Sequence, residues 1–96
     1  MAAFGLTLTT DAWADARTQA RRASTDGMRR IAEKQYRKGI EKLEKANEIL
    51  PHPNVQYNIG QAYLSLEEYP AAIRWFKAYL RQPVSTEDAA RVQALV

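Results

Sequence analysis

A thirty-three-residue internal period constrains the fold of this chain more than any other feature of its sequence. Gly27 and Gly39 stand twelve positions apart, and Gly60 and Ala72 repeat that spacing thirty-three residues later. The same shift aligns four further pairs: Ile31 with Leu64, Tyr36 with Tyr69, Ile40 with Ile73, and Leu43 with Phe76. A period of this length is typical of helical arrays, in which each unit is one pair of helices. The sequence therefore predicts an all-α fold of antiparallel helix–turn–helix repeats.

Apolar and small residues at three- and four-residue spacings predict where the helices lie. The first helix is expected to begin at Thr10 or Asp11 and to end at the turn 33–35. The next three are expected over 36–50, 54–66 and 70–82, and the last after Ser85. Asn54 and Ser85 are the predicted N-caps of the third and last helices. Within each pair the small residues are expected to bring two helix backbones into contact, at Gly27–Gly39 and Gly60–Ala72.

The first residues of the chain leave its location open. Residues 1–10 are expected to be a flexible N-terminal tail or the remnant of a signal peptide, ahead of one domain over 11–96. Residues 2–14 are mostly small or apolar, and Ala12-Trp13-Ala14 resembles a signal-peptide cleavage site, but no basic segment precedes it. The run is shorter than the ~20 apolar residues of a membrane span. A cytoplasmic and an exported or periplasmic protein are both compatible with this segment.

Residues 20–83 resemble two tetratricopeptide repeats, helix–turn–helix units of about 34 residues. In the second unit, 53–83, the resemblance rests on Ile59-Gly60-x-x-Tyr63, Tyr69 and Ala72-x-x-x-Phe76. In the first unit, 20–52, it rests on Gly27, Tyr36, Gly39, Leu43, Ala46 and Pro51. Gln56 stands where the family has a tryptophan. The resemblance implies a capping helix at 85–96, and residues 49–63 are also similar to exported bacterial members of the family.

The resemblance implies a scaffold that binds a peptide or protein segment in a groove formed by the first helix of each unit. The family's groove positions fall here on Arg21, Ser24, Thr25, Met28, Asn54, Tyr57, Asn58, Gln61 and Leu64. Tyr57 is equally compatible with a core aromatic, and Asn58 with a solvated amide. Members that clamp a terminal carboxylate use lysines and asparagines, of which only Asn58 is present at a matching position. The sequence does not identify the partner.

A structural self-assembly unit, stacking through its repeat faces, is the alternative function. Two repeats bury little apolar surface, so either self-association to a homo-oligomer or the end helices are expected to complete the core. Trp75 and Tyr79 lie one turn apart and form a candidate association surface, unless the last helix covers them.

Charge and sequence motifs limit the other functions that the chain can have. Residues 17–45 carry ten Arg or Lys against four Asp or Glu. Such a segment can bind nucleic acid or an anionic surface, but without interleaved aromatics a solvated helix face is the simpler interpretation. The chain has no cysteine and one histidine, and no nucleotide-binding or hydrolase motif. We therefore expect no enzymatic activity, cofactor or metal.

Overall fold

The computed structural model describes residues 2–96, with side chains from residue 11 onward. In this range the chain forms five helices and no strand, so the predicted all-α fold is confirmed. The helices are α1 (Ala2–Ala32), α2 (Tyr36–Ile49), α3 (Pro53–Ser65), α4 (Tyr69–Leu80) and α5 (Thr86–Gln93). The predicted start of the first helix was wrong, because α1 begins at Ala2 rather than at Thr10 or Asp11. Met1 lies outside the described residues.

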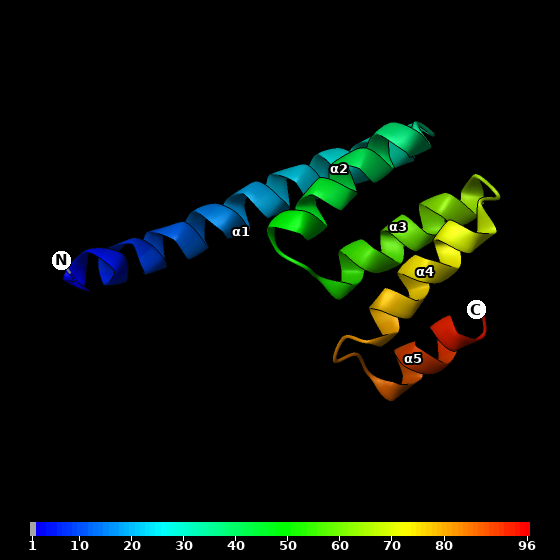
Figure 1. Ribbon diagram of the computed structural model, residues 1–96. Coiled ribbons are helices and arrows are strands. Elements are labelled where there is room, and N and C mark those ends of the chain that lie inside the picture. The colour runs from blue at the N-terminus through cyan, green and yellow to red at the C-terminus, as the bar shows by residue number, and fades with distance from the viewer. Residues whose placement is uncertain (1) are drawn as a thin grey trace.

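The helices stack in chain order as two antiparallel hairpins followed by one helix. α1 packs on α2, α2 on α3, α3 on α4, and α4 on α5 (Figure 1). α1 has 31 residues and α2 has 14, so the N-terminal half of α1 projects beyond the rest of the molecule. The hairpins α1–α2 and α3–α4 are the predicted helix–turn–helix repeats.

The two hairpins turn in the same way. Lys34 and Glu67 stand thirty-three residues apart, and both have left-handed backbones, with φ of 63° and 59°. Each turn carries the paired backbone hydrogen bonds of a Schellman motif: Lys34 N to Ile31 O (2.9 Å) and Gln35 N to Arg30 O (2.8 Å); Glu67 N to Leu64 O (2.9 Å) and Glu68 N to Tyr63 O (3.0 Å). The period found in the side chains therefore extends to the backbone of the turns.

The glycines set how closely the helices approach. A Cβ atom added to Gly27 would lie 2.9 Å from the carbonyl oxygen of Gly39, and one added to Gly39 would lie 2.8 Å from that of Gly27. The predicted backbone contact between these two helices is therefore confirmed. At Gly60 the nearest neighbour is instead the ring of Phe76, 2.6 Å from an added Cβ. Phe76 lies one turn beyond Ala72, the predicted neighbour, and fills the space that Gly60 leaves.

Two apolar clusters form the core. One joins α2 to α3 and contains Ile40, Leu43, Ala46, Val55, Ile59 and Ala62. The other joins α4 to α5 and contains Ala72, Phe76, Tyr79 and Val92. Ser85 Oγ accepts a hydrogen bond from Asp88 N at 3.1 Å, so the predicted cap of the last helix is confirmed. Leu95 and Val96 are exposed beyond the end of α5.

Candidate binding cleft between α1 and α3

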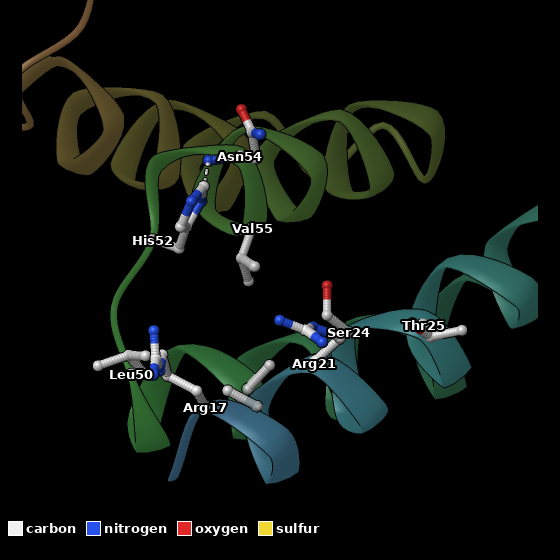
Figure 2. Close-up of a pocket in the computed structure, with 10 residues that line it drawn as sticks. Arg17, Arg21, Ser24, Thr25, Leu50, His52, Asn54 and Val55 are labelled. Atoms are coloured by element: carbon white, nitrogen blue, oxygen red, sulfur yellow. Dashed lines mark hydrogen bonds between the residues drawn. The ribbon is translucent and has the colours of Figure 1, made fainter. Parts of the chain in front are cut away.

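A cleft of about 360 Å³ lies where α1, the end of α2 and the start of α3 meet (Figure 2). Its volume falls in the ~300–1,000 Å³ range of ligand sites in proteins. The residues that line it are Arg17, Ala20, Arg21, Ser24, Thr25, Ala46, Leu50, His52, Asn54 and Val55. Half of them come from two consecutive turns of α1, so this helix supplies one complete wall.

The α1 wall is polar and basic. Arg17 and Arg21 lie one helical turn apart, and Ser24 and Thr25 continue the same face with two hydroxyl groups. From residue 11 onward, no Asp or Glu side chain lines the cleft. Within the described side chains neither arginine takes part in an ion pair. Two guanidinium groups thus face one open space without a carboxylate, which leaves their donors available to a ligand.

The side of the cleft opposite α1 is mainly apolar, with His52 and Asn54 at its rim. Val55 points from the first turn of α3 toward α1, and Leu50 lies at the end of α2 (Figure 2). Ala46 closes the floor and is fully buried in the α2–α3 cluster. A basic wall facing an apolar floor can hold a segment that carries both charge and an apolar side chain.

The connection between α2 and α3 is fixed by short-range contacts. Leu50 is extended, at φ −153° and ψ 101°, as expected of a residue that precedes a proline. The N-cap of α3 is His52, not the predicted Asn54: His52 Nδ1 accepts a hydrogen bond from Asn54 N at 3.1 Å. The prediction failed because Pro53 occupies the first helical position and places the N-cap two residues earlier than predicted. The rim of the cleft is therefore a defined turn.

Four of the predicted groove residues line the cleft: Arg21, Ser24, Thr25 and Asn54. The Asn54 side chain points away from α1 in Figure 2. Met28 is exposed one turn further along α1 and does not line the cleft. The cleft thus contains only part of the predicted groove, and lies between residues 17–25 of α1 and the first turn of α3.

The remaining predicted groove residues lie on another part of α3. Tyr57 packs against the rings of Phe76 and Tyr79, with centroids 6.0 and 5.7 Å away. Its hydroxyl accepts a hydrogen bond from Gln61 Nε2 at 2.8 Å. Leu64 packs against the α4–α5 cluster, and Asn58 is half-buried. These four residues contribute to the α3–α4 contact or its edge, and none lines the cleft.

Trp75 and Tyr79 do not form one exposed patch. Tyr79 is 6% exposed and packs with Val92 of α5, so the last helix covers it. Trp75 is half-buried against the α2–α3 cluster. Of the two, only Trp75 offers surface to a partner.

The structure adds cleft residues that the groove prediction did not include. Arg17 joins Arg21 because helical periodicity places residues four apart on one face, a signal that the sequence did contain. Leu50 and Val55 join from across the proline turn, and no local pattern predicts that juxtaposition. Gln56 follows Val55 in α3 but does not line the cleft, and it is 4% exposed. Its Nε2 donates a hydrogen bond to Asn47 Oδ1 at 3.2 Å, whereas its Oε1 has no hydrogen-bond partner among the described residues.

A second basic surface lies on the other side of α1. Arg22, Lys42 and Lys45 line it together with Asp26, whose carboxylate pairs with Arg29, Arg30 and Lys42. The hydrogen bond from Arg29, together with the nearby cations, lowers the pKa of Asp26 below its ordinary value. Much of the positive charge around Asp26 is thus already neutralised, in contrast to the cleft.

No protein-family model, curated protein or solved structure matches this chain. Across residues 2–96, no helix combines the length and apolar character needed to cross a membrane.

Proposed function

We propose that this chain is a protein–protein interaction module of the tetratricopeptide-repeat type, and that the α1–α3 cleft binds a peptide segment of its partner. The repeat-type assignment is supported by two hairpins with matching turns at Lys34 and Glu67, thirty-three residues apart. It is supported further by the close backbone crossing at Gly27 and Gly39. Units of about 34 residues with such crossings stack into binding scaffolds.

The observation that carries the binding proposal is the chemistry of the cleft. Arg17 and Arg21 hold donors without a carboxylate partner, while Ser24 and Thr25 supply groups that both donate and accept. Leu50 and Val55, above the buried Ala46, offer an apolar surface to a side chain of the ligand. A peptide presents carbonyl oxygens, amide groups and side chains together, so one segment can use all three kinds of surface.

A structural unit that assembles end to end is the second candidate function. It is favoured by apolar side chains exposed at both ends of the array: Trp13, 57% exposed on the projecting part of α1, and Leu95 and Val96 after α5. Stacked repeats bury such surfaces against a neighbouring unit. Light scattering on a concentration series separates the two functions, because an assembling unit grows in mass as its concentration rises.

Selection from an unbiased peptide library tests the binding proposal. Peptides enriched on the wild-type chain should bind the Thr18→Trp variant with the same affinity as the wild type. Their affinity for the Ala20→Trp variant should be at least tenfold lower. Ala20 lines the cleft, so an indole there fills it, whereas Thr18 is exposed on α1 outside it. Circular dichroism and thermal unfolding establish that both variants are folded. Equal affinity for both variants, or no enriched peptide, would refute binding in the cleft.

A further inference from the structure

We infer that the bound segment is an extended acidic stretch in which two carboxylate side chains flank one apolar side chain. This inference rests on the proposed function, because it specifies the ligand of the same cleft. It comes from three features of the described residues: the unpaired guanidinium groups, their spacing along α1, and the position of the apolar floor across from them.

Charge determines the sign of the ligand. Arg29 and Arg30, further along α1, pair with Asp26, but Arg17 and Arg21 face a cleft that no carboxylate lines among the described side chains. A guanidinium group offers a fork of donors that matches a carboxylate in two parallel hydrogen bonds. The cleft is therefore complementary to two carboxylates, one for each arginine.

Spacing determines the register of the ligand. Arg17 and Arg21 are four residues apart, which in a helix is a separation of about 6 Å along the axis. In an extended chain, residues i and i+2 are about 6.6 Å apart and point to the same side. An extended segment is narrower than a helix with its side chains, whose diameter is roughly 10–12 Å, and so needs less of the 360 Å³ cleft. An extended segment with acidic residues at i and i+2 therefore matches the spacing of the two arginines.

The opposite wall determines the residue between the two acids. Val55 points across the cleft toward α1, and Leu50 lies at the end of α2, on the other side of the proline turn (Figure 2). When residues i and i+2 of an extended segment face α1, residue i+1 faces the other way, toward this apolar surface. The expected core of the ligand is therefore an acidic, an apolar and an acidic residue in succession.

Synthetic peptides test the ligand directly. An acetylated and amidated octapeptide with aspartate–leucine–aspartate at its centre should bind at least tenfold more tightly than its asparagine–leucine–asparagine counterpart, by fluorescence anisotropy. An aspartate–aspartate–leucine isomer of equal charge should also bind several-fold more weakly. A neutral octapeptide with a free terminal carboxylate separates the two sources of the anion. If that peptide binds and the amidated acidic one does not, the paired side-chain inference is overturned.

Paired variants test the location with matched charge. Arg17→Gln with Arg21→Gln should weaken binding of the acidic octapeptide at least tenfold. Arg22→Gln with Lys45→Gln removes the same charge from the other side of α1 and should change affinity less than threefold. Equal losses in both pairs would mean nonspecific attraction and would overturn the inference.

The unbiased peptide selection separates this inference from the proposed function. If enriched peptides lack acidic pairs but still discriminate Ala20→Trp from Thr18→Trp, the cleft binds peptides and the acidic register is wrong. If neither the library nor the octapeptides yield binding, both the proposed function and this inference fail.

Discussion

Gly27 and Gly39 bring the backbones of α1 and α2 into contact: a methyl group on either residue would come within 2.9 Å of the other's carbonyl oxygen. The pair lies in the first hairpin, whose α1 carries the basic wall of the cleft. The obstructing atoms include these two carbonyl oxygens as well as the side chains of Leu43 and Ile31, so rotating a side chain alone cannot remove the contact. The separation of α1 and α2 therefore depends on the absence of two side chains.

Gly27→Ala is expected to destabilise the chain by about 1–2 kcal/mol. Overpacking of this kind costs about 1–3 kcal/mol, and alanine recovers up to about 1 kcal/mol in helix propensity. Urea unfolding followed by circular dichroism measures the difference. Lys38→Ala, at an exposed position of α2, is the control and should change stability by less than about 0.5 kcal/mol. Stability equal to or above that of the wild type would show that the helices separate freely.

Lys34→Gly and Glu67→Gly should each stabilise the chain by about 0.5–1 kcal/mol. Both residues hold a left-handed backbone that costs a side-chain-bearing residue about 1–2 kcal/mol, partly offset by the greater freedom of glycine in the unfolded chain. Thermal unfolding provides the measurement. Lys38→Gly places the same residue inside α2 and should instead destabilise by about 1 kcal/mol. A loss of stability in the turn variants would contradict this explanation.

Above pH 10 the chain should lose stability because of the buried phenol of Tyr79. Burial raises the pKa of its phenol above the ordinary value of 10.0, so the folded state retains a proton that the unfolded state has already lost. Stability is therefore full below pH 10 and falls as the pH rises from 10 toward the raised pKa. Urea unfolding at pH 8 and pH 11 should show this loss, reduced in Tyr79→Phe.

The pKa of Tyr63 is also raised, by burial and by the adjacent Glu44, so the Tyr79→Phe variant should retain part of the alkaline loss. Tyr79→Phe with Tyr63→Phe should reduce that loss further. An alkaline loss that is the same in the wild type and in both variants would assign it to other groups.

Gln56→Met is expected to raise the stability by about 1 kcal/mol. The amide is buried, its Oε1 lacks a partner, and such a group costs about 1–3 kcal/mol that an apolar side chain of similar size avoids. In this variant Asn47 Oδ1 still accepts a hydrogen bond from the backbone N–H of His52, which lies at 3.4 Å. Asn47→Ala is the opposite case, since it leaves the Gln56 amide without its single partner, and should destabilise. Calorimetry measures the unfolding of both variants and the wild type. If Gln56→Met is less stable than the wild type, Oε1 of Gln56 accepts a hydrogen bond in solution.

The sequence predicted those parts of the fold that depend on residues close together in the chain. Periodicity gave the helix pairs, and the repeated spacing of Gly27 and Gly39 gave the crossing, because both follow from the pitch of one helix. The cap of α5 was predictable because Ser85 acts on its own following turn.

The candidate site was less predictable because its walls come from different helices. Arg17 and Val55 line one cleft only because the proline turn after Leu50 directs α3 toward α1. Tyr57 was assigned to the groove, but its position depends on the rings of Phe76 and Tyr79, which lie about twenty residues further along the chain. The start of α3 was missed because Pro53 occupies its first position and because histidine is an uncommon cap.

The matching turns at Lys34 and Glu67 have a consequence for engineering. Since the two positions are equivalent in both sequence and backbone, residues 34–66 form a cassette whose ends are compatible with each other. If a second copy is inserted after Leu66, each junction falls at a turn with the same backbone geometry as in the present chain. Further copies would lengthen the protein by one cassette at a time.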